Sequence, residues 1–345
     1  MTLADLYHDA VVAGDGIPLH FGDEGHEYQA ALEQAVVMDR SHEGRFEITG
    51  RDRLDLLNRI STNDLITLEA GEGRPTLFTN AVARILDRAT VYHRGERTLV
   101  LTEPGRGEAL RRYLQRNIFF NDDAHLNDIA STTRQFVLHG PHADEIARAF
   151  APDLAPLHST DIVIAGVPVI IARDKPISGG HWRLIVANEG APQVWAALLA
   201  HGAIPAGSLT YNLLRIRAGR PGVGHELSQD YIPLELGLWD EVSFTKGCYT
   251  GQEIIARMES RGRLAKTIVT LKLAAGVEAP AKISADGREV GTLTSSTQTP
   301  NGEQIGIGVV KVAQAQAGAH LLIEGQTDAE ITGLPGAQPP NLAEA

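Results

Sequence analysis

Cys248 is the one cysteine in a chain of 345 residues, and its neighbours are suited to activating a thiol. It lies in the segment KGCYTGQE, with Lys246 two positions before it and Gly247 and Gly251 on either side. A nearby ammonium group and a helix N-terminus both lower the pKa of a thiol. A free cysteine is more often a small buried apolar residue, but the glycine and polar neighbours favour a functional thiol on a tight loop.

A helix is expected directly after this loop. Thr250 and Glu253 have the S/T-x-x-E spacing of a capping box, in which each side chain bonds the backbone N–H of the other. The apolar residues of 254–258 would form the buried face of the helix. Its N-terminus would then lie beside Cys248, with Glu253 holding the cap.

The same helix carries a basic face. Glu253, Arg257 and Arg261 recur every four residues, in the order that favours an ion pair. A solvated helix face with one ion pair accounts for this spacing, and an anion-binding edge beside Cys248 accounts for it as well.

Three other places carry polar or aromatic groups that could meet a ligand. The segment Ser61–Asp64 follows an expected helix, where its side chains either line a cleft or simply turn the chain. Asp87 lies inside an expected strand over 84–92, and an inward carboxylate there would bond a polar ring such as a pterin. Tyr211, in an expected helix over 209–218, either packs in the core or stacks on a flat ligand.

Composition and absent motifs exclude several classes of protein. The net charge of -12 argues against nucleic acid or an anionic membrane as the partner. A single cysteine fits a reducing compartment, and no membrane-spanning run or signal peptide is evident, so we expect a cytoplasmic protein. The sequence holds no G-x-G-x-x-G after a strand, no Walker A loop, no G-x-S-x-G elbow and no metal-binding histidine spacing, so no metal is expected.

The expected elements form two similar α+β halves. A strand over 45–49, Gly50 and a helix over 52–60 return ninety residues later as a strand over 136–138, Gly140 and a helix over 141–150. Matching apolar positions in the two copies indicate an internal duplication. Further helices are expected over 28–37, 107–116 and 192–199.

The chain changes character from about residue 264. Short alternating strands are separated by glycine turns, and Asp286–Gly287 marks a hairpin. We therefore predict α+β domains over 1–130 and 131–262, an antiparallel β-barrel over 263–335, and a disordered tail over 336–345.

KGCYTGQE, with Ile254–Arg257 after it, closely resembles the signature of the YgfZ-type folate-binding proteins, which belong to the family of the glycine-cleavage T-protein, an aminomethyltransferase. Weaker matches follow in the family's order: Ser61–Asp64 with its T-N-D segment, Leu138–Pro141 with its G-P turn, and Leu214–Pro221 with its R-I-E-A-G-x-P helix end.

The resemblance implies two related α+β domains around a central channel that binds tetrahydrofolate, plus a C-terminal antiparallel β-barrel. It also implies a role in making or maintaining iron–sulfur enzymes, with iron–sulfur proteins or assembly factors as partners and the motif cysteine as the functional thiol. The residue roles implied are chemistry at Cys248, Lys246 and Asp87, folate contacts at Asn63, Asp87, Tyr211, Arg257 and Arg261, and the motif loop at Gly247, Tyr249, Gly251, Gln252 and Glu253.

Two positions bear on the choice between branches of the family. Arg217 stands where the family usually has Glu, which contacts folate in the T-protein branch, so that contact is in doubt. Asp87 falls where the aminomethyltransferases carry their key acid. An aminomethyltransferase or demethylase with Asp87 as acid/base is therefore the alternative, and a purely structural partner protein is a third.

Overall fold

The computed structural model describes residues 7, 9–261 and 264–337. The chain divides into two compact units, of which the first comprises Met1–Leu57, Leu65–Pro75 and Ala89–Leu214, and the second comprises Asn58–Asp64, Thr76–Arg88 and Arg215–Ala345. Within the described ranges, no helix combines the length and apolar character that crossing a bilayer requires.

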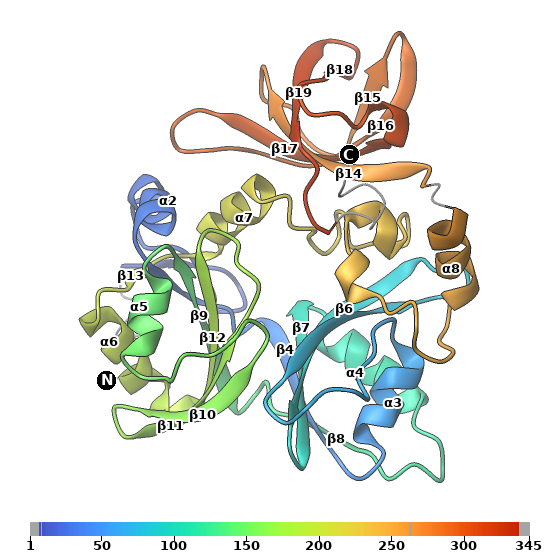
Figure 1. Ribbon diagram of the computed structural model, residues 1–345. Helices are drawn as coiled ribbons and strands as arrows, with labels where there is room; N and C mark the ends of the chain where they lie inside the picture. The colour runs from blue at the N-terminus through green and yellow to red at the C-terminus, as the bar shows by residue number, and fades with distance from the viewer. Residues whose placement is uncertain (1–6, 8, 262–263, 338–345) are drawn as a thin grey trace. The chain divides into compact units, whose positions relative to one another are not determined.

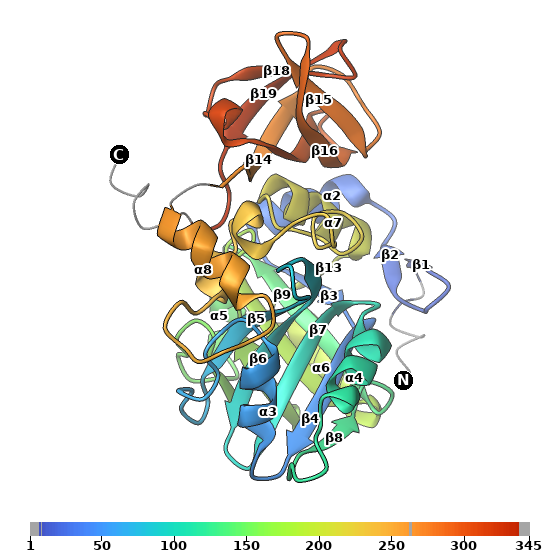
Figure 2. The ribbon, with the colours of Figure 1, turned by 90° about the vertical axis from the view of Figure 1, so that its right-hand side faces the viewer.

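The first unit contains most of a five-stranded sheet with the order β5-β6-β7-β4-β8. Its strands are β4 (Glu43–Thr49), β5 (Gly73–Thr79), β6 (Ile85–Arg94), β7 (Arg97–Pro104) and β8 (His125–Asp128). The helix α4 (Gly107–Arg116) packs beside β4 and β8 (Figure 2), with Leu110 and Leu114 buried. Three of the boundaries between the two units fall inside elements, namely β5, β6 and the helix α3 (Arg53–Ile60).

A six-stranded sheet with the order β10-β11-β12-β9-β3-β13 also lies in the first unit (Figure 1). Its strands are β3 (Val36–Asp39), β9 (Thr133–Gly140), β10 (Ser159–Ile164), β11 (Val167–Arg173), β12 (Gly180–Ala187) and β13 (Ile204–Pro205). All neighbours in this sheet are antiparallel except β13 and β3.

Both faces of the six-stranded sheet are covered, because alternate residues of a strand point to opposite sides. Val37 and Phe136 pack with α5 (Ala143–Arg148) and α6 (Ala191–Ala200). Val36 and Val137 pack with α2 (Glu24–Glu33) and α7 (Ser208–Arg217). The remaining short elements of this unit are β1 (Val11–Val12), β2 (Pro18–His20) and η1 (Asn188–Gly190).

The two sheets repeat one pattern, which confirms the expected pair of related α+β halves. In each, a first strand (β4 or β9) is followed by a helix and then by three strands that pair in chain order beside it. Gly50 and Gly140 occupy the equivalent turns with φ of +99° and +118°. A Cβ would lie 2.2 Å from a backbone oxygen at Gly50 and 2.3 Å from one at Gly140, so both turns require glycine.

The second unit contains a closed six-stranded antiparallel barrel, as predicted, with the order β14-β17-β16-β15-β18-β19 (Figure 1). Its strands are β14 (Lys266–Leu273), β15 (Ala281–Ala285), β16 (Arg288–Gln298), β17 (Gln304–Lys311), β18 (His320–Ile323) and β19 (Thr327–Gly333). Asp286 and Gly287 join β15 to β16 with φ of +49° and +72°, which confirms the hairpin. The helical elements of this unit are η2 (Pro233–Leu236), η3 (Trp239–Glu241), α8 (Gln252–Arg261) and η4 (Val312–Gln314).

One local expectation was wrong. The helix expected over 28–37 begins earlier, because the Asp23 side chain accepts the His26 N–H at 2.9 Å, and it ends before the β-branched Val36–Val37 pair, which joins a strand. The disordered tail expected over 336–345 stays a prediction; of its described residues, Ala337 donates its N–H to the Gly237 carbonyl at 2.8 Å. Residues 338–345 lie outside the described residues.

The predicted domain boundaries stay predictions. Strand β3 lies in the range predicted for the first domain, yet it pairs with β9 in the range predicted for the second. Pairings between segments a hundred residues apart are not encoded in local periodicity, so the interleaving of the halves has no local signal.

Candidate functional site

The KGCYTGQE loop joins η3 to α8 within the second unit, and Lys246 fixes its first half. The ammonium group donates to the carbonyl oxygens of Asn58 at 2.5 Å, Ser61 at 2.7 Å and Asn63 at 2.7 Å. It also lies 5.1 Å from the centre of the Tyr249 ring. Three donors thus meet three acceptors at the end of α3, where backbone carbonyls lack helical partners.

Burial lowers the pKa of Lys246 to about 8, and the Asp64 carboxylate opposes this effect. The ammonium therefore serves as an anchor for the loop. That the Lys246 ammonium also activates the Cys248 thiol stays a prediction.

The second half of the loop is fixed by Tyr249, Thr250 and Gly251. Tyr249 is buried, and burial raises the pKa of its hydroxyl to about 12. The Thr79 hydroxyl donates to the Thr250 carbonyl at 2.6 Å. Gly251 has φ of +88°, and a Cβ there would lie 2.7 Å from the Asn80 oxygen and 2.9 Å from the Ala83 Cα. Only glycine fits this position.

The predicted capping box is not formed. The left-handed Gly251 immediately precedes α8, and its carbonyl accepts the Ile255 N–H, so Gly251 rather than Thr250 takes the cap position. Glu253 instead pairs with Arg257 at 2.8 Å. The Gln252 amide bonds back to the Lys246 carbonyl at 3.4 Å and closes the loop.

Cys248 is exposed between these two anchored halves. It lies four residues before the first residue of α8, outside the turn over which the helix dipole acts. Gly247 beside it is also exposed, and a Cβ there would meet nothing within 4 Å. The loop thus fixes its flanking residues and leaves the thiol in solvent.

Ser61, Thr62 and Asn63 are buried, and the Ser61–Asp64 segment does more than turn the chain. The Thr62 hydroxyl donates to the Glu241 carbonyl at 2.8 Å, and the Asn63 amide nitrogen donates to the Asp240 carbonyl at 3.1 Å. Since Lys246 bonds the Asn63 carbonyl, this segment connects η3 directly to the cysteine loop.

Asp87 lies on β6 with 6% of its surface exposed, next to an ion pair that sequence reasoning missed. Its Oδ1 accepts the Arg88 N–H at 3.0 Å. The Arg88 guanidinium in turn holds the Glu241 carboxylate with two bonds of 2.7 and 2.6 Å, both side chains being nearly buried. A charged residue next to Asp87 inside a strand was the available signal, but its partner lies 153 positions away.

The structure therefore brings Asn63, Asp87 and Lys246 onto one hydrogen-bonded framework around η3. The predicted basic edge is more exposed: Arg257 pairs with Glu253 on the surface of α8, and the Arg261 side chain lies outside the described residues. Arg217 forms an exposed pair with Glu303 at 3.2 Å.

Tyr211 lies in the first unit, on α7, and is nearly buried. The Arg40 guanidinium covers one face of its ring, with Cζ 3.7 Å from the ring centre, and the His139 ring lies 5.7 Å away. That Tyr211 stacks on a ligand stays a prediction.

Arg40 belongs to a buried charge cluster that the sequence did not reveal. The Glu43 carboxylate accepts bonds from Arg40 at 2.8 Å, from Arg183 at 2.5 Å and from Gln135 at 2.6 Å. Arg183 also bonds Asp174 at 2.7 Å. Burial alone would raise the pKa of Glu43, but Arg183 and Arg40 outweigh it and hold that pKa well below its usual range.

With this fold and site, the chain belongs to the family defined by the GCVT N-terminal domain, whose family model matches residues 13–246. It is 33% identical to At1g60990, a chloroplastic protein of Arabidopsis thaliana that carries the provisional name of a transferase, over 89% of this chain and 72% of that protein. It is 28% identical to an aminomethyltransferase of Geobacillus kaustophilus, over 89% of this chain and 88% of that enzyme.

A solved structure has the same fold. The glycine cleavage system aminomethyltransferase T from Bartonella henselae matches with a TM-score of 0.85 over 98% of both chains, at 19% sequence identity. The family model and the relative at 33% identity confirm the T-protein part of the resemblance drawn from the sequence.

Proposed function

We propose that this protein is a YgfZ-type tetrahydrofolate-binding accessory protein for the assembly or repair of iron–sulfur enzymes, with Cys248 as its functional thiol and the cytoplasm as its location. The observation that carries the proposal is the exposure of Cys248 on a loop whose flanks are fixed by Lys246 and Gly251. A cysteine kept only for packing would be buried, whereas this loop presents the thiol to a partner.

The donors and acceptors of the second unit fit a reduced pterin. Asp87 is a nearly buried carboxylate whose orientation is fixed by the Arg88 N–H, and such a group accepts the N–H donors along one edge of a pterin ring. Asn63, on the same hydrogen-bonded framework, adds an amide. When bound, tetrahydrofolate supplies the carrier for one-carbon units. Relatives named as aminomethyltransferases support this choice of cofactor.

The first test compares Cys248→Ala with Thr245→Ala, an exposed residue of the same loop. In cells lacking the protein, we expect Thr245→Ala to restore the activity of iron–sulfur enzymes and Cys248→Ala to fail. Both purified variants should keep the wild-type melting temperature and tetrahydrofolate affinity. Full restoration by Cys248→Ala would refute a role for the thiol.

Folate binding is tested by calorimetric titration with tetrahydrofolate under reducing conditions. We expect a Kd of about 1 µM or tighter, near -8 kcal/mol. An Arg217→Glu variant restores the family's usual residue at a site where the native side chain pairs with Glu303. Binding only by the variant would mean that Arg217 has removed folate affinity, and binding by neither would favour a purely structural partner protein.

The aminomethyltransferase alternative rests on the near-buried position of Asp87 and on the similarity to enzymes of that name. It requires turnover of a methylamine donor in the presence of tetrahydrofolate. Turnover that is lost in Asp87→Asn but retained in Cys248→Ala would favour this alternative over the accessory role.

A further inference from the structure

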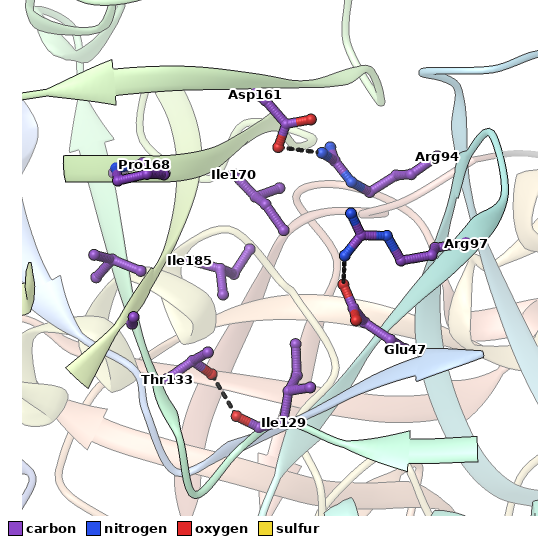
Figure 3. Close-up of a pocket in the computed structure, with 12 residues that line it drawn as sticks. Glu47, Arg94, Arg97, Ile129, Thr133, Asp161, Pro168, Ile170 and Ile185 are labelled. Atoms are coloured by element: carbon purple, nitrogen blue, oxygen red, sulfur yellow. Dashed lines mark hydrogen bonds and ion pairs between the residues drawn. The ribbon is translucent and has the colours of Figure 1, made fainter. Parts of the chain in front are cut away.

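A pocket of about 300 Å³ lies between the two sheets of the first unit, and none of the residues given a role above lines it. Its walls come from β4, β6 and β7 of the five-stranded sheet and from β9 to β12 of the six-stranded sheet (Figure 3). We call it the inter-sheet pocket. This volume falls at the lower end of the range for small-molecule sites.

One side of the inter-sheet pocket is apolar. Ile129, Ile170 and Ile185 line it, and they continue a buried cluster through which the two sheets pack. Ile129 and Ile170 are only partly buried, so apolar surface faces the pocket. Covering such surface with an apolar ligand is favourable.

The opposite side carries two guanidinium groups, which Figure 3 shows near one another and facing Ile170 and Ile185. Arg94 donates to the Asp161 carboxylate at 2.5 Å and to the Ser159 hydroxyl at 3.3 Å. Arg97 donates to the Glu47 carboxylate at 3.0 Å. A guanidinium has five N–H donors. The bonds of Arg94 and Arg97 to described residues therefore leave each of them with N–H groups for a further acceptor.

The Arg94–Asp161 pair is unequal in burial. The Arg94 side chain is 12% exposed, but that of Asp161 is 79% exposed. An exposed carboxylate on a flexible side chain contributes little to an ion pair and exchanges readily. Burial lowers the pKa of Arg94, whereas the Asp161 carboxylate raises it and so offsets part of the cost of burying this guanidinium.

We propose that the inter-sheet pocket binds a small carboxylic acid with an apolar body. Its carboxylate accepts from Arg94 and Arg97 in place of Asp161, and its body lies on Ile170 and Ile185. This site is separate from the proposed folate function and does not depend on it.

The test uses 2-naphthoate and its neutral analogue 2-naphthylmethanol, titrated calorimetrically into the full chain. We expect naphthoate to bind at least tenfold more tightly. Arg97→Gln should weaken naphthoate about tenfold, because charge-assisted hydrogen bonds are lost. Ile170→Trp should fill the pocket and abolish binding. Arg112→Gln, an exposed arginine on α4, is the matched control and should change nothing.

The direction in which Asp161→Asn changes the naphthoate affinity is the decisive observation. This exposed carboxylate competes with the ligand for Arg94, so its removal should tighten naphthoate binding severalfold. Weaker naphthoate binding in Asp161→Asn would mean that Asp161 positions Arg94 and does not compete with the ligand for it, and would overturn the proposal. Equal affinity for the acid and the alcohol, or binding unchanged by Ile170→Trp, would overturn it as well.

Discussion

At the scale of single residues, the cysteine loop depends on Gly251 and Lys246 more than on the helix that follows. Sequence spacing identified the right segment, but the expected cap at Thr250 was wrong because a left-handed glycine takes its place. Of the contacts that fix the loop, the left-handed backbone at Gly251 and the Lys246 side chain are therefore the two whose loss should matter most.

Gly251→Ala should destabilise the protein by about 2–4 kcal/mol, since it combines a strained φ with a clash against backbone atoms. Gly247 is the matched control, because a Cβ there meets nothing within 4 Å and its φ is not positive. Gly247→Ala should change stability by less than about 1 kcal/mol. Urea denaturation measures both, and equal effects would contradict the assigned role of Gly251.

Lys246→Met should lower stability by about 1–3 kcal/mol at neutral pH, because three carbonyl oxygens lose their donor. The pKa of Lys246 is about 8 in the folded chain, against about 10.4 when unfolded. Between these values the unfolded chain binds the extra proton, so stability rises with pH. The difference between wild type and variant should therefore grow from about pH 8 to about pH 10.

Denaturation at a series of pH values checks this expectation, with Lys272→Met, an exposed lysine of β14, as the control. A difference that stays flat or shrinks above about pH 8 would show that Lys246 is not held in the way described.

At the scale of secondary-structure elements, local periodicity was informative. The helix expected over 107–116 has those bounds, and those expected over 192–199 and 209–218 differ by one residue at each end. The buried charges were not predictable, because Arg88 and Glu241 are 153 positions apart and Glu43 and Arg183 are 140 apart. Sequence patterns indicate which face is buried, but not which distant charge a buried charge meets.

Glu43 joins β4 to β12 and β9 through Arg183 and Gln135, so its loss should affect the whole first unit. Glu43→Gln removes the buried carboxylate that Arg40 and Arg183 share, although Arg183 keeps its bond to Asp174, and should cost about 3–5 kcal/mol. The lowered pKa of Glu43 means that its contribution is present above the usual Glu range and is lost as the pH falls below it.

The stabilities of wild type and Glu43→Gln should therefore begin to approach each other as the pH falls below about 4, and continue to do so in stronger acid. Glu108→Gln removes an exposed partner of Arg111 and is expected to leave stability unchanged. A variant that stays less stable by the same amount at every pH would contradict the charge argument and point to packing instead.

At the scale of the whole molecule, one exposed cysteine and a net charge of -12 together affect how fast two copies of the chain form a disulfide. Because the chain has a single thiol, it cannot form an internal disulfide, and a disulfide between copies of this protein joins two chains through Cys248. Two such molecules repel each other, and dissolved salt screens that repulsion.

The rate of disulfide-linked dimer formation should therefore rise severalfold between about 20 mM and about 500 mM salt, as the Debye length falls from roughly 20 Å to roughly 4 Å. Alkylation of Cys248 by uncharged iodoacetamide reports the accessibility and reactivity of the thiol without this repulsion, and should be unchanged. Non-reducing gels and mass spectrometry follow the two reactions. If both reactions accelerate equally, salt is changing the loop itself; if neither does, the charges near Cys248 outweigh the charge of the whole chain.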